Sequence, residues 1–327
     1  MWTMAASFST QFRNIQDNLY RETRNMLEAF ESDSDKTELI FLEHIQAWIL
    51  LAMFEFMHNN HQRGLMSAGR AFRLVQMLCL FEIDSPSYAM ARQSCAPTDH
   101  VKPEESRRTF WVAYTMDRVV SFNYGLPLTL NELEICTRLP TPEAKFQSGE
   151  PALMGFLCEF MGGINQDSVP PFTECIILAT ICGRSVSHKQ RMTVERVYGA
   201  STQDSLDRHQ WLNTILAARI PSPVPQLSFH VRVFLYLYKI IEPVVLDKDE
   251  NQGMMAQYEQ QSLTAAEETS HLTKNAGAAE PFPSSSVRPG LPFCVCRILH
   301  ETQKREPILR PTAPGNIGSS PQIGRFQ

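Results

Sequence analysis

The chain has 327 residues, of which 43% are hydrophobic and 20% are charged, and its formal net charge at pH 7 is −5. This composition is typical of a globular protein with a sizeable core, arranged as one large domain or two modest ones. A net negative charge argues against a protein that grips phosphates directly, because its surface repels them at long range. We find no signal-peptide pattern at the start. The longest apolar run, residues 45–57, is shorter than the roughly 20 residues that span a bilayer, so no membrane association is expected.

Three helices are predicted in the first 80 residues. Apolar residues recur at helical spacing over residues 8–30, and residues 36–58 are apolar over most of the circumference of a helix. The short break at Asn59 and Asn60 separates this helix from a third, over residues 62–80, and makes the pair an antiparallel hairpin. The many Met and aromatic side chains of the hairpin are expected to form a bundle core. The alternative is an adaptable apolar pocket for a small metabolite.

Residues 104–124, after a polar loop at 84–103, are predicted to form the helix around which the others pack. Glu104 and Glu105 lie in its first turn, where carboxylates oppose the positive end of the helix dipole. Between residues 110 and 122 the apolar side chains go almost all the way round the helix, which is typical of a helix buried on most sides.

The end of this helix is marked by Gly125, which can adopt a left-handed backbone conformation. Pro127 prevents the helix from resuming. Thr129, with Glu132 three residues later, has the pattern of a capping box, which predicts a second, shorter helix closed off by Pro140.

Four charged residues of the central helix need explanation. Asp117 and Arg118 have no opposite charge at helical neighbour spacings, so if they are buried they require partners from other elements. The candidate partners are Arg70 or Arg73 for Asp117, and Glu43 or Glu55 for Arg118. Arg107 and Arg108 lie against the helix dipole near the helix start. For these two, pairing with the carboxylates of the first turn or with another helix is favoured over a bound anion.

The second half of the chain is also predicted to be helical. Residues 137–151 are predicted to form a loop, and they are followed by predicted helices at 152–161, 171–187, 190–198, 203–219 and 254–274. Residues 227–241 fit a strand or a helix equally well, and we assign a helix because no partner strand is in sight.

The character of the sequence changes at residue 276. Eight prolines fall within the last 52 residues and apolar periodicity ends, so residues 276–327 are predicted to be a disordered tail. Residues 1–275 carry 24 Lys and Arg against 32 Asp and Glu, whereas the tail carries 6 against 3. We therefore predict an all-α fold, with one acidic helical domain over residues 1–275 packed around the central buried helix.

Twelve residues in two motifs carry a resemblance to a known family. Gly69 and Arg73 lie in the helix at 62–80, and the second motif comprises Arg107, Arg108, Phe110, Trp111, Asp117, Arg118, Gly125, Pro127, Leu139 and Pro140. With these motifs in this order, the chain resembles the fungal-specific transcription factor domain, best over residues 43–140. This domain is the middle, regulatory region of fungal binuclear zinc-cluster transcription factors. Cys79 stands where the family usually carries the glycine that ends the preceding helix.

The resemblance implies a regulator of transcription in the nucleus that controls a fungal metabolic or secondary-metabolite gene set. It implies protein partners from the transcription machinery or a homologous factor, and it allows a small-molecule effector. Two alternatives stay open: a stand-alone interaction protein that modulates an intact zinc-cluster factor, and a small-molecule-binding helical protein.

The eight cysteines are scattered, and no two have the C-x-x-C spacing, so they are expected to be reduced and mostly buried thiols. The family's zinc cluster needs six closely spaced thiolates, and we find no such module in the sequence. Zinc, and contact with DNA, are therefore expected only through a separate zinc-cluster module.

Candidate catalytic and metal-binding residues are better explained by structural roles. His44, His58 and His61 have no accompanying cysteine or carboxylate. Cys175 and Cys182, seven residues apart on one helix face, are expected to be core thiols rather than a redox pair. The sequence also contains no G-x-S-x-G, G-x-G-x-x-G or Walker-type motif. We therefore predict that the chain is not an enzyme and assign it no catalytic, cofactor-binding or metal-binding residue.

Overall fold

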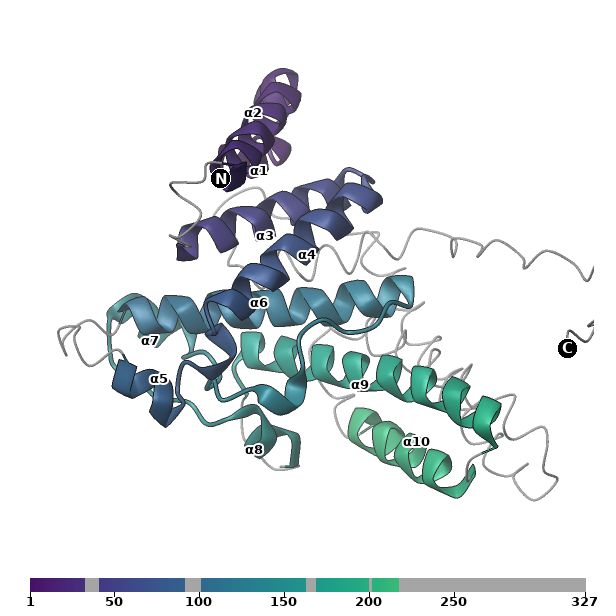
Figure 1. Ribbon diagram of the computed structural model, residues 1–327. Coiled ribbons are helices and arrows are strands. Elements are labelled where there is room, and N and C mark those ends of the chain that lie inside the picture. Colours follow the sequence, from purple (N-terminus) through teal and green to yellow (C-terminus); the bar gives the residue numbers. More distant parts are fainter. Residues whose placement is uncertain (33–40, 92–100, 163–168, 200–201, 218–327) are drawn as a thin grey trace, which may run out of the picture.

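The computed structural model describes residues 1–32, 41–91, 101–162, 169–199 and 202–217. Within these ranges every regular element is helical, which confirms the predicted all-α class (Figure 1). The α-helices are α1 (Trp2–Ser7), α2 (Arg13–Ser32), α3 (Leu42–Met57), α4 (His61–Met77), α5 (Pro86–Ala91), α6 (Val101–Tyr124), α7 (Glu143–Ser148), α8 (Leu157–Gly162), α9 (Pro171–Tyr198) and α10 (Thr202–Ala217). Single 3-10 turns lie at Thr10–Phe12, Leu80–Glu82 and Glu132–Glu134. None of the described helices is long and apolar enough to cross a membrane.

Helix α6 is the central element. It packs against the α3–α4 hairpin on one side and against α9 on the other (Figure 1). Every residue from Thr109 to Phe122 is buried, because apolar side chains surround the helix and neighbouring helices cover it. This confirms the prediction of a central buried helix.

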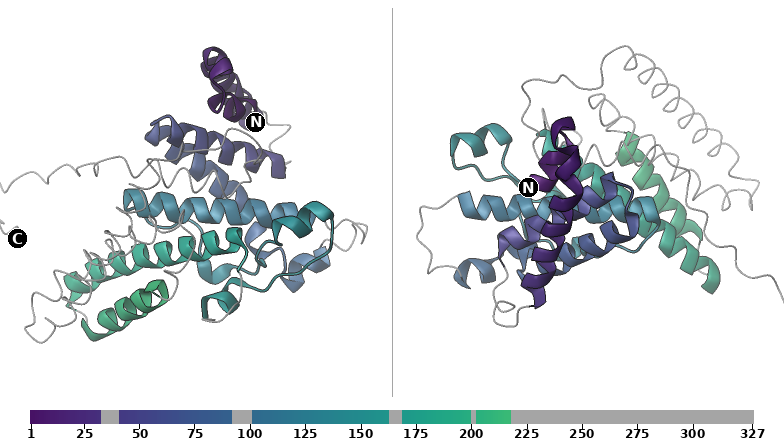
Figure 2. Two further views of the ribbon diagram at one scale, coloured as in Figure 1. Left: turned by 180° about the vertical axis from the view of Figure 1, so that it is seen from behind. Right: turned by 90° about the horizontal axis from the view of Figure 1, so that it is seen from above.

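The outer helices continue this layered arrangement. Helices α1 and α2 pack on α3, and α10 packs on α9, so that α6 has layers on both sides (Figures 1 and 2). The core includes Trp48 and Trp111, both fully buried, from α3 and α6 respectively. The Met and aromatic side chains of the α3–α4 hairpin are largely part of this core, as predicted.

Two helix ends follow the expected backbone signals. Gly125 has a φ of +67° and directly follows α6, so it supplies the left-handed residue that the sequence predicts. Cys79, after α4, has a φ of +51° and is also left-handed. A side chain in that conformation costs about 1 kcal/mol relative to glycine, and the fold accommodates this cost.

Some predicted loops contain short helices. The predicted loop at 84–103 contains α5, because Pro86 suits a first helical turn and the hydroxyl of Ser85 accepts a hydrogen bond from the backbone N–H of Tyr88 at 3.1 Å. The predicted loop at 137–151 contains α7, which follows Pro142.

Other predicted boundaries were wrong. The predicted helix at 8–30 is divided into a 3-10 turn and α2, and the separate helix α1 precedes it. The separate helices predicted at 171–187 and 190–198 form the single helix α9, which ends at Gly199 in a left-handed conformation. The predicted helices at 227–241 and 254–274, the domain boundary near 275 and the tail lie outside the described residues.

The predicted capping box at Thr129 was also wrong. The structure has a single 3-10 turn at Glu132–Glu134, and its cap is Asn131, whose side-chain oxygen accepts from the backbone N–H of Leu133 at 3.1 Å. The N–H of Thr129 instead donates to the carboxylate of Asp117. This tertiary bond holds the chain at a bend before the turn.

The two glycines of α4 provide a matched test of hairpin packing. A Cβ at Gly64 would lie 2.8 Å from ring carbons of Phe56, whereas a Cβ at Gly69 would meet nothing within 4 Å. We expect Gly64→Ala to lower the free energy of unfolding by about 1–3 kcal/mol through overpacking. Gly69→Ala should raise it by about 0.5–1 kcal/mol through helix propensity. Urea unfolding of both variants measures the difference, and equal shifts would contradict this packing.

Candidate functional site

The residues that follow α6 form an irregular segment, 126–142, which runs back along this helix and which we call the return segment. Its path depends on Asp117, which is 1% exposed. The Asp117 carboxylate accepts hydrogen bonds from the backbone N–H groups of Thr129 at 3.0 Å and Leu130 at 3.0 Å. Burial raises the pKa of Asp117, while Arg118 and these N–H donors act in the opposite direction. We call this set of contacts the Asp117 clamp.

Arg118 completes the Asp117 clamp. Its guanidinium donates to the Asp117 carboxylate at 2.8 Å and to the backbone carbonyl of Leu130 at 2.6 Å. It also lies over the ring of Tyr114, 3.4 Å from the centroid. The Tyr114 hydroxyl is within 3.1 Å of the hydroxyl of Thr180 on α9, so the clamp extends to the neighbouring helix.

The pairing of Asp117 with Arg118 corrects the prediction that each finds its partner on another helix. Arg70 instead lies near Glu31, at 3.4 Å, and over the ring of Trp48. Glu55 accepts hydrogen bonds from the side chains of Tyr20, Arg24 and Ser67. Among the described residues, none of the four candidate partners pairs with Asp117 or Arg118. Adjacent residues meet here because the Arg118 side chain folds back toward the same loop backbone that Asp117 binds.

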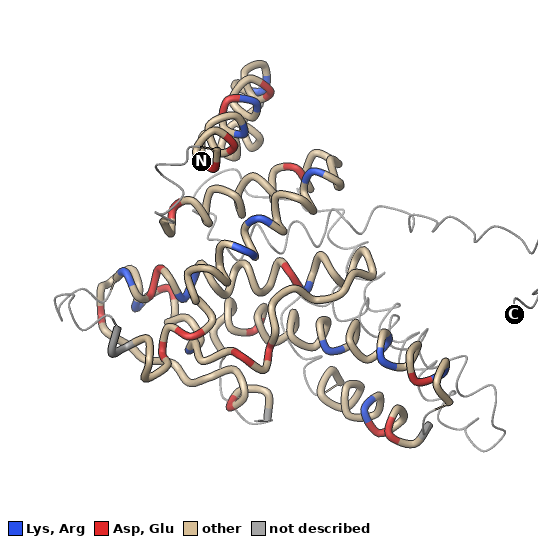
Figure 3. The backbone as a smooth tube through the Cα atoms, viewed as in Figure 1, with Lys and Arg blue, Asp and Glu red and all other residues tan. Residues whose placement is uncertain are grey.

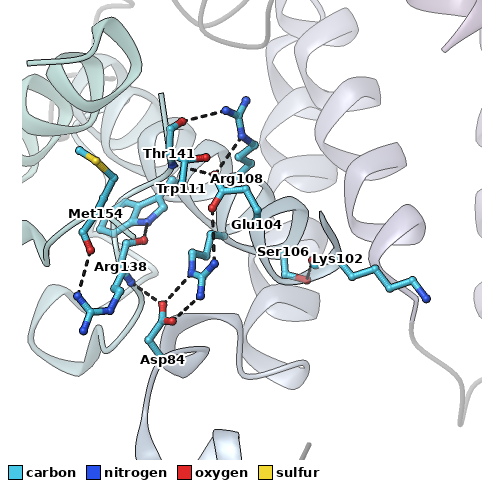
Figure 4. Close-up of polar contacts among 10 residues, drawn as sticks. Asp84, Lys102, Glu104, Ser106, Arg108, Trp111, Arg138, Thr141 and Met154 are labelled. Atoms are coloured by element: carbon cyan, nitrogen blue, oxygen red, sulfur yellow. Dashed lines mark hydrogen bonds and ion pairs between the residues drawn. The ribbon is translucent and has the colours of Figure 1, made fainter. Parts of the chain in front are cut away.

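A second cluster holds the other end of the return segment (Figure 4). Arg107 donates to both carboxylate oxygens of Asp84, which also accepts from the backbone N–H of Arg138 at 2.9 Å. Although burial opposes ionisation, these donors lower the pKa of Asp84 below its usual value. Arg107 also lies 3.5 Å from Glu104. Arg107 thus pairs with a carboxylate of the first turn, as expected, and also with Asp84, which the sequence did not indicate.

Arg108 forms the outer part of this cluster. It donates to Glu104 at 3.2 Å and to the backbone carbonyl of Thr141 at 3.0 Å (Figure 4). It also donates to Glu143 at 2.6 Å. Glu104 in turn accepts from the backbone N–H of Thr141 at 2.8 Å. The indole N–H of Trp111 donates to the carbonyl of Arg138 at 2.7 Å. The N-terminal half of α6 thus binds the second half of the return segment mainly through backbone groups.

The family-signature residues fall into three groups in the structure. Six of them supply the polar contacts or the core of α6: Arg107, Arg108, Phe110, Trp111, Asp117 and Arg118. Gly125, Pro127, Leu139 and Pro140 shape the return segment; Leu139 is buried, and Pro127 accepts a hydrogen bond from Ser121 through its carbonyl. Gly69 and Arg73 lie exposed on α4, and nothing in the described part of the chain explains Arg73.

The three histidines considered as metal ligands each contact a protein partner. His44 accepts a hydrogen bond from the indole of Trp48 at 3.0 Å, and His58 stacks on the ring of Phe54. His61 hydrogen-bonds to the hydroxyl of Tyr124. Among the described residues, no group of three His, Cys, Asp or Glu side chains is placed to hold a metal ion.

A cleft of about 780 Å³ lies between the return segment, α9 and α10. Its walls include Leu128 and Leu130 of the return segment, and His188, Arg208 and Trp211 of the two helices. The Asp117 clamp binds the backbone of Leu130 directly. Sequence patterns did not indicate this cleft. Its residues come from three segments that helical periodicity does not bring together.

Two buried histidines lie between α9 and α10. The rings of His188 and His209 have centroids 5.5 Å apart, and both side chains are buried. Burial, together with the charge of Arg208, lowers the pKa of His188 to about 4, and burial with the neighbouring His188 lowers that of His209 to about 3. Both imidazoles are therefore neutral at pH 7.

The fold, the Asp117 clamp and the second cluster define the class of protein. It is an all-helical scaffold in which charged residues of the buried helix α6 hold the return segment. Comparison with known proteins then gives the family. The fungal specific transcription factor domain matches residues 1–189, which is more than half of the chain. The chain belongs to this family.

Several curated relatives resemble most of the chain. The pigment biosynthesis transcriptional activator of Monascus ruber is 43% identical over 311 residues, which cover 90% of this chain and 55% of the relative. The citrinin biosynthesis transcriptional activator of Monascus purpureus is 40% identical over 311 residues, covering 90% and 53% respectively. The azaphilone cluster-specific transcription factor of Aspergillus niger is 40% identical over 289 residues, covering 84% and 62%.

The chain spans little more than half the length of these relatives. No solved structure matches it.

Two signature arginines provide a matched test of the Asp117 clamp. Arg118 is 1% exposed and Arg73 is exposed. Arg118→Ala leaves the Asp117 carboxylate buried without its counter-charge, so we expect a loss of about 3–5 kcal/mol in the free energy of unfolding. Arg73→Ala should change it by no more than about 0.5 kcal/mol. Chemical denaturation measures both values, and similar losses for the two variants would show that the clamp is not what stabilises the fold.

The buried histidine pair predicts acid sensitivity. Because the pKa of His188 is about 4 in the folded state and 6.5 in the reference state, the unfolded chain binds more protons than the folded chain between these values. Stability therefore falls as the pH decreases from 7 toward 4. We expect His188→Leu to reduce the loss between pH 7 and pH 5 by about 2 kcal/mol. Unfolding curves at the two pH values test this, and an unchanged loss in the variant would contradict it.

Proposed function

We propose that this chain is the regulatory region of a transcription regulator that controls a secondary-metabolite gene set in a fungus. The observation that carries the proposal is the family match over residues 1–189, together with relatives that are named as transcriptional activators of pigment and citrinin biosynthesis. The signature residues Arg118 and Arg107 of α6 form the contacts of the Asp117 clamp and of the second cluster, which supports a domain that folds as the family signature requires. The proposed location is the nucleus.

The proposed mode of action is the binding of protein partners rather than catalysis. The acidic character of residues 1–275 favours contacts with proteins over direct contacts with phosphates. Partners of the transcription machinery or a homologous factor are the candidates. Contact with DNA, and the zinc that it requires in this family, are proposed to come from a separate zinc-cluster module.

A second candidate function, binding of a small-molecule effector, is supported by the cleft beside the return segment. The alternative considered from the sequence was a pocket in the α3–α4 hairpin, but the side chains there are largely part of the predicted core. The cleft lies on the other side of α6, at α9 and α10, and combines apolar and polar side chains as ligand sites do.

Deletion of the gene from the fungus that encodes it tests the proposed function. In cultures that transcribe the gene, we expect deletion to change the transcripts of a co-regulated set of biosynthetic genes several-fold. Reintroduced wild type and Arg73→Ala should restore the transcripts, whereas Arg118→Ala should not. RNA sequencing measures the outcome. Unchanged biosynthetic transcripts in the deletion strain would contradict the proposal.

A further inference from the structure

The cleft between the return segment, α9 and α10 has the size of a ligand site. Its volume of about 780 Å³ falls within the range of roughly 300–1,000 Å³ that is usual for small-molecule pockets. Leucines of the return segment form one wall, and polar side chains of α9 and α10 form the others. The cleft is a structural feature that neither the family signature nor the names of the relatives assigns.

His188 is a buried polar group in the wall of the cleft that lacks a hydrogen-bond partner. It is 4% exposed, and neither ring nitrogen has a hydrogen-bond partner among the described residues. A buried polar group left in this way destabilises the fold, because it has lost its hydrogen bonds to water without gaining others. The neutral imidazole carries one donor and one acceptor. A ligand hydroxyl or carbonyl in the cleft would satisfy one of them.

Arg208, which lines the cleft together with Arg184 and Arg191 and with the carboxylates of Glu132 and Asp207, has a donor left without a partner in the described part of the chain. Arg208 and Arg191 share a single carboxylate, that of Glu195, at distances of 2.6 Å and 2.8 Å (Figure 3 shows the charged positions of α9 and α10). The Nε of Arg208 is buried and has no hydrogen-bond partner among the described residues. Charge-assisted hydrogen bonds are stronger than neutral ones, so this guanidinium favours an anionic group on the ligand.

An aromatic surface completes the cleft. Trp211 is 45% exposed, which is a large exposure for an indole, and the guanidinium of Arg184 lies 4.9 Å from its ring centroid. Arg184 is itself fixed by Glu132 of the return segment at 2.6 Å. Indole and guanidinium planes both favour flat ligands, because they offer stacking surfaces.

We propose that this cleft binds a planar aromatic organic acid. Its ring system lies against Trp211 and the leucines of the return segment, its carboxylate or phenolate pairs with Arg208, and a hydroxyl or carbonyl oxygen bonds to His188. The proposal deepens the second candidate function, because it names the class of small molecule that the cleft binds. Its use as an effector of transcription rests on the proposed function.

Occupancy of the cleft would reach the centre of the fold through the return segment. Leu130 lines the cleft, and its backbone N–H and carbonyl are bound by Asp117 and Arg118. A ligand that fixes this segment therefore stabilises the folded state, by an amount that grows with the logarithm of its concentration relative to its dissociation constant. Binding at the cleft is thereby linked to the Asp117 clamp, as an effector site requires.

Titration of the full-length protein with 6-hydroxy-2-naphthoate, followed by calorimetry, tests the proposal. We expect saturable binding at one site, and we expect binding of the neutral 6-hydroxy-2-naphthamide to be at least about tenfold weaker, because the anion makes a charge-assisted contact. His188→Leu and Trp211→Ala should each weaken binding of the acid at least about tenfold. Arg73→Ala, far from the cleft on α4, should bind like the wild type.

Three outcomes would overturn the proposal: no saturable binding of the naphthoate, equal affinity for acid and amide, or unchanged affinity in both cleft variants. Trp211→Ala keeps the test informative if His188→Leu does not fold, because Trp211 is partly exposed. Failure here is distinguishable from failure of the proposed function. The first appears in binding to the purified protein and the second in transcripts of the deletion strain.

Discussion

The structure depends on one buried carboxylate. Asp117 lies in the middle of the central helix α6 and, at 1% exposure, is almost entirely removed from water. Isolated, such a charge would cost several kcal/mol, and its cost is offset by Arg118 and by two backbone N–H groups of the return segment. These interactions thus have two effects. They neutralise a charge in the core, and they provide hydrogen-bond partners for backbone groups of the return segment.

The Asp117 clamp and the cluster around Arg107 and Arg108 connect the family signature with the return segment, part of which lines the cleft. Arg107 and Arg108 hold the second half of the return segment, and the Asp117 clamp holds the first. Between α6 and α9, a Cβ at Gly183 would lie 2.6 Å from Cγ of Arg118, so α9 can approach the clamp closely only with a glycine there. Through Leu130, Asp117 and Arg118 therefore help to build one wall of the cleft, whereas Arg107 and Arg108 hold residues of the return segment that do not line it.

The sequence was sufficient to predict the class of fold and the position of the central helix. The nearly continuous apolar circumference of residues 110–122 and the glycine at 125 are local signals, because they depend only on helical periodicity and on backbone preference. The partners of Asp117 could not be predicted in this way. They are mostly backbone groups of a segment without periodicity, and rules for helical neighbour spacing do not include an adjacent arginine that folds back toward them.

The cleft could not be predicted for a related reason. His188 and Trp211 lie on different helices, and only the packing of α10 on α9 brings them to one cavity beside Leu130.

The central claim is that the Asp117 clamp fixes the return segment, and hydrogen exchange of the amides of Thr129 and Leu130 tests it most directly. We predict that both exchange as slowly as core amides of α6 in the wild type and become fast in Asp117→Asn, while α9 remains protected. Fast exchange of both amides in the wild type would contradict the account.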